Sequence, residues 1–381
     1  MPIFSQNRKK FLKRVVIIGG GLAGLTCAIQ LCKAGVPCTV IEKKEYPFHR
    51  VCGEYISNEV VPYLKANGLY PGEFNPPQIK NFLLSSVSGR HEKMKLDLGG
   101  FGISRFTFDN YLYKKAKNAG VQFLLSQEVE RVLFNSNKFF IHTTSTQLEA
   151  DVVIGAFGKR SRMDRFLNRR FLNARSPYVG VKYHIRCDYP DDLISLHNFS
   201  GGYCGMSNVE DKKTTLCYLT HRDTVKQFKS LVVMEQSVMF KNPYLRSVFT
   251  NAEFLFQKPE VINEVSFVTK TPVEDHILMA GDSAGMIAPL CGNGMAMAIH
   301  SGKILSDLIS EYVNSNHLSR EWLEKSYEAA WNSHFKRRLW IGRQVQRLFG
   351  NAIASQLAVG LVINSRPIAN LIVKNTHGQP F

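Results

Sequence analysis

A glycine-rich loop between two apolar runs constrains the fold of this chain more than any other feature. Residues 15–18 are four β-branched residues in a row, which predicts a buried strand. Gly19, Gly21 and Gly24 follow in GxGxxG spacing, and residues 22–32 carry apolar side chains at helical intervals. Strand, glycine loop and helix in this order predict the first βα unit of a dinucleotide-binding fold.

The three glycines and the acid that follows them have separate expected roles. Gly19 allows a tight turn, Gly21 lets the backbone approach a diphosphate, and Gly24 lets helix and strand pack closely. A second apolar strand over residues 38–41 ends in Glu42, which can accept hydrogen bonds from a ribose with a free 2′-hydroxyl. A 2′-phosphate would be repelled there, so NADP is not expected in this site. The diphosphate is expected at the helix N-terminus, and this stretch alone leaves both FAD and NAD open.

The cysteines and the first residues of the chain limit the class of protein that it can be. The eight cysteines are scattered without a CxxC pair, which is typical of a reducing cytoplasm and favours neither a disulfide framework nor a zinc site. The basic start NRKKFLKR runs directly into the first strand without a secretory signal, and no apolar run could span a bilayer. We therefore expect a cytoplasmic protein without a metal site, peripheral to a membrane if it contacts one.

The net charge of +17 would favour contact with polyanions. The basic residues concentrate near the start, over residues 158–170 and over residues 334–347. Such a surplus can attract nucleic acid, an anionic membrane surface or an acidic carrier protein. Because no RNA- or DNA-binding motif accompanies it, nucleic acid is not expected as a partner.

A second glycine-containing element far along the chain decides the cofactor. An apolar strand over residues 277–280 leads into a Gly-Asp pair, and a later glycine pair opens a helix. An Asp at a strand end can bind a ribityl hydroxyl, and a helix N-terminus facing the isoalloxazine can stabilise negative charge on reduced flavin. A plain NAD dehydrogenase has no need of this element, so FAD is expected. The cofactor-binding residues expected here are Gly281, Asp282, Pro289, Gly292, Asn293, Gly294 and Met295.

The order GxGxxG, Glu42, GDSAG and GNGMAMA resembles the FAD-dependent oxidoreductases of the p-hydroxybenzoate-hydroxylase fold. That family includes aromatic-ring hydroxylases, flavin halogenases and geranylgeranyl reductases, and the resemblance covers most of residues 1–310. The stretch FHRVCGEYIS, residues 48–57, is most similar to the geranylgeranyl-reductase-like branch, which has a Cys-Gly-Glu after the ribose acid. Further cofactor-binding residues expected from the first two blocks are Ala23, Lys43, Arg50, Cys52 and Gly53.

The stretch ISRFTFDNYLYKKAKNAG, residues 103–120, resembles the family's segment in which an Arg near the cofactor precedes a helix. Arg105 matches that Arg, so the resemblance implies a cofactor contact. The alternative is an ion pair between Arg105 and Asp109 at the helix start. Both interpretations stay open from the sequence.

One departure from the family bears on the electron donor. Residues 150–162 resemble its second fingerprint, which usually ends in Ala-Asp-Gly, but Phe157 stands in place of the Asp. In the family that Asp is thought to serve both the flavin and a nicotinamide dinucleotide, so its replacement puts a family-like NAD(P)H route in doubt. Gly158 and Ser161 still match, and Gly158 is expected at the FAD.

Other departures separate the branches of the family. Gly285 and Ala296 replace the His and Asn that are usual in aromatic hydroxylases, which favours the reductase-like branch. That branch's Tyr-x-Trp-x-Phe-Pro motif is missing, and residues 201–219 lie at the corresponding place with Tyr203 and Cys204. The halogenase motif Trp-x-Trp-x-Ile-Pro cannot exist here, because all three tryptophans fall in the expected C-terminal helices.

The expected fold class is α/β, in an α+β two-domain arrangement. A Rossmann-like FAD-binding domain is expected beside a mixed β-sheet substrate domain, with helices at the C-terminal end. Strand regions of the substrate domain are expected near residues 80–98, 178–188, 194–219 and 261–269. The expected boundaries are residues 12–77, 100–165 and 265–315 for the FAD-binding domain, 78–99 and 166–264 for the substrate domain, and 316–381 for the C-terminal helical region.

The last part of the chain bears on how a substrate would arrive. Residues 352–374 are apolar but interrupted by Pro367, so they are expected either to pack over the substrate domain or to form a hydrophobic lip for a lipid-like substrate. In the second case the preceding FKRRLWIGRQVQRLF, residues 335–349, would be a basic amphipathic helix at a membrane or an acidic carrier protein.

These features lead to one expected function and two alternatives. We expect an FAD-dependent oxidoreductase that reduces a double bond of a large apolar, isoprenoid- or polyketide-like substrate, with NADH or NADPH as transient electron donor. One alternative is a monooxygenase that hydroxylates or epoxidises such a substrate through a C4a-hydroperoxyflavin. The other is a non-catalytic flavoprotein. The catalytic candidates are Cys52, Tyr203 and Cys204, with His49 and His184 as further candidate proton donors.

Overall fold

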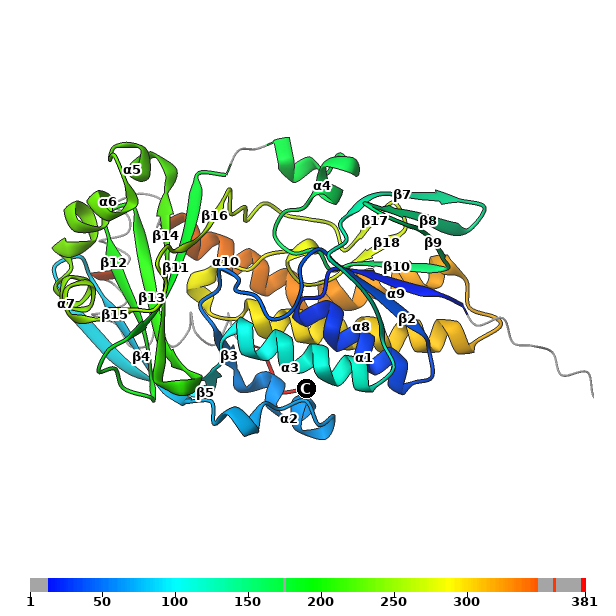
Figure 1. Cartoon of the computed structure of the whole chain (residues 1–381), viewed down its shortest axis with the longest axis horizontal. Coiled ribbons are helices and arrows are strands. Elements are labelled where there is room, and N and C mark those ends of the chain that lie inside the picture. Colours follow the sequence, from blue (N-terminus) through cyan, green and yellow to red (C-terminus); the bar gives the residue numbers. More distant parts are fainter. Residues whose placement is uncertain (1–12, 174–175, 349–358, 361–377) are drawn as a thin grey trace, which may run out of the picture.

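The computed structural model describes residues 13–173, 176–348, 359–360 and 378–381. Two large β-sheets lie at opposite ends of the long axis, and helices fill the space beside and between them (Figure 1). This mixed arrangement of sheets and helices is the α/β class that the sequence predicts.

The first sheet contains the glycine loop. Its strand order is β17-β18-β10-β1-β2-β6, and all neighbours pair in parallel except the edge strand β17. β1 is central and every residue in it is buried, as expected for a run of β-branched side chains in a parallel sheet. The strands are β1 (Val15–Ile18), β2 (Cys38–Glu42), β6 (Gln122–Leu125), β10 (Val152–Gly155), β17 (Val273–Glu274) and β18 (Ile277–Met279).

Three helices pack together beside this sheet (Figure 1). α1 contacts both α3 and α8, and the approach to α8 is close because Gly302 has no side chain. A Cβ on Gly302 would lie 2.5 Å from the Ala23 carbonyl oxygen. A separate three-stranded sheet, β7-β8-β9, lies beyond β10. The bounds are α1 (Leu22–Lys33), α3 (Arg105–Asn118), α8 (Gly294–Asn314), β7 (Val129–Asn135), β8 (Lys138–Thr143) and β9 (Gln147–Ala150).

The second sheet has nine strands in the order β15-β11-β14-β13-β12-β4-β5-β3, with β16 also paired to β11. Only the β12–β4 pair is parallel, so the sheet is mixed. The region expected as strand over residues 261–269 ends at Asn263, because Glu264 takes φ +59° and leaves the extended conformation. The strands are β3 (Tyr55–Ser57), β4 (Gln78–Ser85), β5 (His91–Gly102), β11 (Tyr178–Arg186), β12 (Leu193–Phe199), β13 (Gly202–Val209), β14 (Lys213–His221), β15 (Glu253–Phe254) and β16 (Glu260–Asn263).

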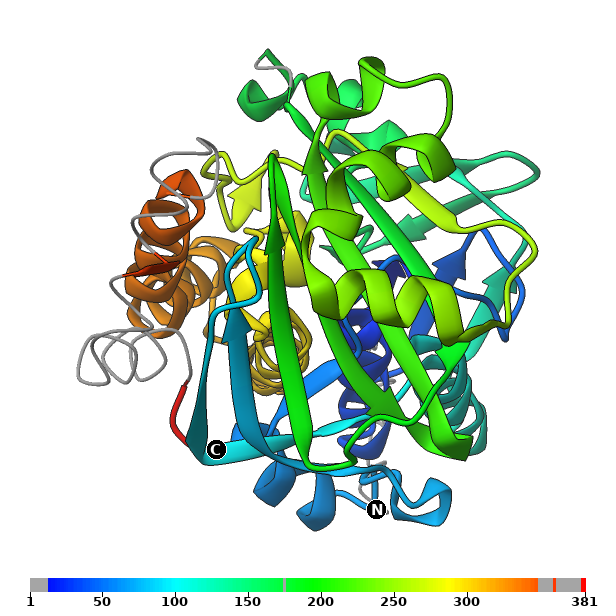
Figure 2. The same ribbon diagram turned by 90° about the vertical axis from the view of Figure 1, so that its left-hand side faces the viewer.

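Short helices cover the outer face of this second sheet (Figure 2). Their apolar side chains form a core with every second residue of β11 and β14, as the period of two in a strand requires. The opposite face is therefore turned toward the first sheet. The covering helices are α5 (Arg222–Lys226), α6 (Leu231–Val238) and α7 (Pro243–Asn251). Two further short helices are α2 (Val61–Ala66) and α4 (Arg162–Phe166).

The C-terminal region is helical as far as the structure describes it. α9 (Arg320–Trp331) continues through a wider turn over Asn332–Lys336 into α10 (Arg337–Leu348), and these helices hold all three tryptophans. The apolar segment 352–374, with Pro367, lies outside the described residues apart from 359–360. No helix within the described ranges is long and apolar enough to cross a bilayer.

Two of the cysteines form a close pair, which leads to a testable prediction. The Sγ atoms of Cys32, at the end of α1, and Cys38, at the start of β2, are 3.7 Å apart. The hydrogen bond from Cys38 lowers the pKa of Cys32 to about 7, whereas the same bond and burial raise the pKa of Cys38. We expect iodoacetamide near neutral pH to alkylate Cys32 several-fold faster than the other partly exposed cysteines, because only the thiolate reacts. Peptide mass spectrometry would check this, and earlier labelling of Cys187 would contradict it.

Candidate functional site

The first glycine loop is too crowded for side chains at two positions. Gly19 has φ +109°, and a Cβ on it would lie 2.3 Å from the Ala156 carbonyl oxygen. A Cβ on Gly24 would lie 2.1 Å from the Gly19 carbonyl oxygen and 3.2 Å from the Ile17 side chain. The loop therefore turns sharply between β1 and α1 and packs against the end of β10.

Gly21 is different, because its missing side chain leaves the loop open on one side. It precedes the first residue of α1, and a Cβ there would meet only a guanidinium nitrogen of Arg105, at 3.5 Å. Arg105 also makes the ion pair that was the alternative from the sequence: Nε to Asp109 Oδ1 is 2.6 Å and Nη2 to Asp109 Oδ2 is 2.7 Å. The pair holds the guanidinium beside Gly21, so it is compatible with an anion on the loop.

The carboxylate of Glu42 is held against the same loop and is only 5% exposed. Its Oε2 accepts a hydrogen bond from the Gly20 backbone N–H at 3.0 Å, and its Oε1 accepts one from the Lys44 N–H at 3.1 Å. The hydroxyl of Tyr46 donates to the Gly20 carbonyl. The acid is therefore fixed at the end of β2, where an adenosine ribose is expected.

A second arginine completes a chain of alternating charges around the loop. Arg50 Nη2 is 3.1 Å from Glu42 Oε2, and Arg50 Nε is 3.0 Å from Asp109 Oδ2. Asp109 thus joins both arginines, Arg50 and Arg105, next to a loop of bare glycine backbone. Exposed N–H groups at a helix start and two guanidiniums are the donors that a diphosphate requires. These residues fit the diphosphate of FAD.

The second glycine-containing element meets the second fingerprint in space. The Gly158 N–H donates to Ser283 Oγ at 2.8 Å, and the buried Lys270 ammonium donates to the carbonyls of Lys159 (2.9 Å) and Asp282 (2.8 Å). Burial lowers the pKa of Lys270 to about 8. Residues 158–159 and 281–283 are thereby bound together at the carboxyl ends of β10 and β18, where ligands bind in open parallel sheets.

The two halves of the expected cofactor site also touch through α1. A Cβ on Gly281, which has φ +58°, would lie 3.4 Å from the Ala23 side chain. Gly292 has φ +67° and α8 begins at Gly294. Of the other candidates from the sequence, Pro289 starts a short turn before that helix, Asn293 and Met295 are buried, Gly53 has open space around it, and Lys43 is exposed.

Phe157 packs against the apolar core around the first sheet. It is partly buried, and a Cβ on Gly155 would lie 2.8 Å from its ring and 2.6 Å from the Met279 sulfur. The residue that replaces the family's Asp therefore contributes an apolar ring at the end of β10. Because Phe157 replaces that Asp, it is the residue that puts a family-like NAD(P)H route in doubt.

Tyr203 and Cys204 lie on opposite faces of β13, because successive strand residues alternate. The Tyr203 hydroxyl accepts a hydrogen bond from the Leu290 N–H at 3.1 Å and donates to Gln346 Oε1 at 3.2 Å, so it joins the sheet to the second glycine loop and α10. Cys204 belongs to the core under α6 and α7. Only Tyr203 of this pair faces the cofactor domain.

The Cys-Gly-Glu stretch ends in a buried ionic cluster that the sequence did not predict. Glu54 has φ +57° and is fully buried. Its Oε1 accepts from Lys182 Nζ and, at 2.8 Å, from the Arg105 backbone N–H. Its Oε2 lies 2.6 Å from His184 Nε2 and accepts from the Thr215 hydroxyl. Glu54 thus ties the loop after Cys52 to β11, β14 and the start of α3.

The charges of this cluster set the protonation of the groups around it. Burial alone would raise the pKa of Glu54, but the Lys182 ammonium and the His184 hydrogen bond outweigh it and hold the pKa well below its usual range. His49 stacks on Phe106 at 4.6 Å, and burial together with Lys182 lowers its pKa to about 4. His49 is therefore neutral near pH 7, which makes it a poor acid for donating a proton.

A second carboxylate fixes the start of α3. Glu210 accepts from the Ser104 N–H at 2.8 Å, from the Ser104 hydroxyl at 2.6 Å and from the Thr107 hydroxyl at 2.8 Å. Burial opposes its charge, but the bonds from Ser104 and the Lys213 ammonium keep the pKa of Glu210 below its usual range. Arg105, the first residue of α3, is thus positioned by carboxylates from two other segments.

Comparison with known proteins assigns the cofactor. Residues 13–179 match the family described as FAD binding domain. The chain thus has an FAD-binding domain and is an FAD-dependent oxidoreductase. The chain is 25% identical to an uncharacterized protein of Methanosarcina barkeri, over 96% of this chain and 91% of that protein. It is 24% identical to digeranylgeranylglycerophospholipid reductase 1 of Methanopyrus kandleri, over 88% of this chain and 90% of that one.

Solved structures of a halogenase and of a reductase-like protein have the same fold as this chain. A flavin-dependent halogenase, CmlS, matches with a TM-score of 0.79 at 18% identity, over 97% of this chain and 74% of that chain. A geranylgeranyl bacteriochlorophyll reductase-like protein from Thermoplasma acidophilum matches with a TM-score of 0.74 at 20% identity, over 93% and 92%. At these identities the structures show the fold alone.

Proposed function

We propose that the protein reduces a carbon–carbon double bond of a large apolar, isoprenoid-like substrate. Two sequence relatives support reduction, because both are named digeranylgeranylglycerophospholipid reductases. They come from two organisms and are 24% and 23% identical to this chain. The missing halogenase tryptophans argue in the same direction, since Trp322, Trp331 and Trp340 all lie in α9 and α10.

The observation that carries the proposal is an apolar cluster between the second sheet and the second glycine loop. Leu196 and Leu219 come from the sheet face that is turned away from α6 and α7, and Met286 comes from the segment before the glycine pair. These side chains are buried against one another, so the sheet face beside the second glycine loop is apolar. Such a face suits a substrate without polar groups and would keep water from the reacting bond. The buried members of the cluster are Leu84, Leu196, Tyr203, Leu219, Val265, Met286 and Val359.

The residues have separate roles in this reaction. FAD, when bound and reduced, supplies a hydride to one carbon of the double bond, and a proton must reach the other carbon. Arg50 and Arg105 would hold the diphosphate, and Glu42 would hold the ribose. Glu54 accepts from the Arg105 backbone N–H and from Lys182, and so holds the start of α3 and the Cys52 loop against β11. The proton would come from water or from Cys52, a partly buried free cysteine on the segment between β2 and β3.

We also propose that the substrate is presented at a membrane surface. Trp340 is 56% exposed on α10, and Lys336 lies exposed four residues before it, on the same side of the helical segment. An exposed tryptophan beside basic side chains is typical of helices that lie at an anionic lipid surface. An acidic carrier protein would use the same charges, and sedimentation with anionic lipid vesicles would separate the two sources.

The test is incubation of the FAD-loaded protein with NADPH or NADH and a lipid bearing geranylgeranyl chains, without oxygen. The expected product gains the mass of two hydrogens for each reduced double bond, as measured by mass spectrometry. A product that gains an oxygen atom when air is admitted would replace reduction by monooxygenation. Unchanged substrate with both nucleotides and with dithionite-reduced protein would contradict the proposal.

A further inference from the structure

Two cysteines that the proposed reaction does not use lie next to each other where α1 ends. Cys32 is the next-to-last residue of α1, and Cys38 is the first residue of β2. Their Sγ atoms are 3.7 Å apart, and Cys38 Sγ also lies 3.6 Å from the Ala28 carbonyl oxygen, one turn earlier in α1. All eight cysteines belong to the described part of the chain, and there this is the only pair of them within hydrogen-bond distance.

The turn between the two cysteines fixes their sulfurs at this distance. The Ala34 N–H donates to the Gln30 carbonyl at 2.9 Å. The Val36 N–H donates to the Leu31 carbonyl at 2.8 Å, and Gly35 between them has φ +74°, the left-handed conformation at which many helices end. A disulfide has an S–S length of about 2.05 Å, so the two sulfurs would have to approach by roughly 1.7 Å to form one.

The two thiols differ in their access to solvent and in their protonation. Cys32 is partly buried and adjoins the exposed residues 33–35, whereas Cys38 is only 4% exposed. The hydrogen bond from Cys38 lowers the pKa of Cys32 to about 7, whereas the same bond and burial raise the pKa of Cys38. An oxidant in solution therefore meets Cys32 first, and meets it partly as the reactive thiolate, with Cys38 placed to react second.

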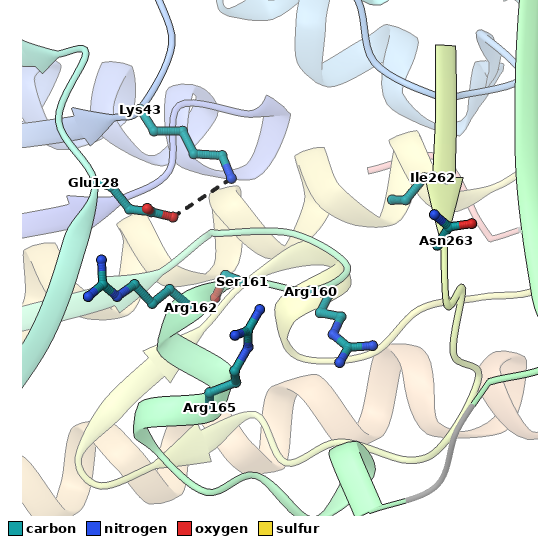
Figure 3. A pocket seen from close by; sticks show the side chains of 8 residues that line it. All are labelled: Lys43, Glu128, Arg160, Ser161, Arg162, Arg165, Ile262 and Asn263. Atoms are coloured by element: carbon teal, nitrogen blue, oxygen red, sulfur yellow. Dashed lines mark ion pairs between the residues drawn. The ribbon is translucent and has the colours of Figure 1, made fainter. Parts of the chain in front are cut away.

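The pair lies away from the cofactor site. Cys38 begins β2, whereas Lys43 directly follows the last residue of β2 and pairs with Glu128 beside a cavity (Figure 3). Cys32 likewise lies at the opposite end of α1 from Gly21, at a distance of roughly 16 Å for a rise of about 1.5 Å per residue. A bond between the two sulfurs is therefore expected to leave FAD bound.

We propose that Cys32 and Cys38 form a reversible modification site, which a hydroperoxide oxidises to a disulfide. In the first step the Cys32 thiolate attacks hydrogen peroxide, the O–O bond breaks, and hydroxide leaves while Cys32 becomes a sulfenic acid. In the second step the Cys38 sulfur attacks Cys32 Sγ, the S–O bond breaks, and water leaves with the Cys38 proton. The peroxide gains the two electrons that the thiols lose. Oxygen forms this oxidant when it takes electrons from a reduced flavin, so a flavoprotein encounters it in air.

The test uses trypsin, which cuts after Lys33 and so separates the two cysteines. The FAD-loaded protein is reduced, freed of reductant and treated with hydrogen peroxide. Its remaining thiols are blocked before digestion and mass spectrometry. Peptides 15–33 and 34–43 are expected to appear joined, two hydrogens lighter than their sum, and to separate in dithiothreitol. Because Cys27 is also in the first peptide, fragmentation of the joined peptides is needed to place the bond at Cys32.

Two variants separate the two steps, and a third serves as the control. In Cys38→Ser the second step is blocked, so the sulfenic acid of Cys32 is expected to accumulate and to be captured by dimedone. In Cys32→Ser no joined peptides are expected. The control Cys187→Ser removes another partly buried cysteine, whose Sγ lies 3.7 Å from the Thr214 hydroxyl, and is expected to form the disulfide as fast as the wild type.

The wild-type protein is expected to oxidise Cys32 at least about tenfold faster than Cys187, because burial raises the pKa of Cys187. Its oxidised form is expected to keep its flavin absorbance and to unfold at a higher temperature than the reduced form, since the bond restricts the unfolded chain. Joined peptides in Cys32→Ser would overturn the inference by assigning the bond to Cys27. Oxidation of Cys187 before any joined peptides form would overturn it as well. No readout requires a lipid substrate, so these results are independent of the proposed reduction.

Discussion

Replacing Glu54 by glutamine is expected to lower the free energy of unfolding by about 3 kcal/mol near pH 7. The variant keeps the shape of the side chain but removes its charge, which leaves the fully buried Lys182 ammonium without its anion. The side-chain amide nitrogen of the glutamine is itself a donor, so it would face one of the donors that now bind the carboxylate. These donors are His184, the Thr215 hydroxyl and the Arg105 N–H. Urea unfolding followed by circular dichroism would measure the change.

The pH dependence of this effect follows from the depressed pKa of Glu54. The stability contributed by such a carboxylate is present above its unfolded pKa, about 4.3, and is lost as the pH falls toward its lower folded pKa. Glutamine does not titrate. The difference between wild type and variant is therefore expected to stay constant from about pH 7 to 5 and to narrow below about pH 4.3.

Two comparisons make this prediction specific. The control Glu253→Gln removes an exposed carboxylate that pairs with Arg186 and is expected to change stability by less than about 0.5 kcal/mol. The double variant E54L/K182L removes both charges and is expected to be more stable than E54Q, because no unpaired ion stays buried. A loss below about 1 kcal/mol in E54Q would show that Glu54 is not the anion that the cluster requires.

The first sheet and its glycine loops were predictable because their signals are local. The strand at residues 15–18, the glycines and the start of α8 near Met295 follow from short patterns that do not depend on distant contacts. The sheet β7-β8-β9 was not predicted, since its strands are half-exposed and alternate irregularly. The expected strand over residues 261–269 was too long because nothing in its composition marks the left-handed residue Glu264.

The part of the site formed by the backbone of the glycine loops was predictable from the sequence. The part formed by ion pairs between distant residues was not. The glycine spacing indicates a turn by itself, whereas the pair of Glu54 and Lys182 joins residues 128 positions apart in the chain. Lys182 and His184 do alternate along β11, which indicates a shared face but not which loop covers that face. Likewise Arg169, counted from the sequence among the basic residues of 158–170, is 2% exposed and donates to Asp164 and to the Ser283 carbonyl.

Gly24→Ala and Gly21→Ala are expected to separate the two roles of the first glycine loop. In Gly24→Ala the new methyl group would lie 2.1 Å from the Gly19 carbonyl oxygen, so α1 must move away from β1. Overpacking of this kind costs about 1–3 kcal/mol, and FAD affinity is expected to fall on the order of tenfold to hundredfold. Both the unfolding midpoint and the flavin content of the purified protein should drop.

Gly21→Ala should act on FAD alone. Its methyl group would meet only Arg105, at 3.5 Å, and the backbone there has an ordinary φ of −88°, so the folded protein without FAD tolerates it. The methyl group would, however, occupy the space that a diphosphate needs above the loop. Gly205→Ala, in β13, serves as the control for both variants. A Cβ on Gly205 would have no atom nearer than 3.7 Å, so the new methyl group has room. If Gly21→Ala retains full FAD affinity, the diphosphate does not lie on this loop. Loss of FAD without loss of stability places it between Gly21 and Arg105.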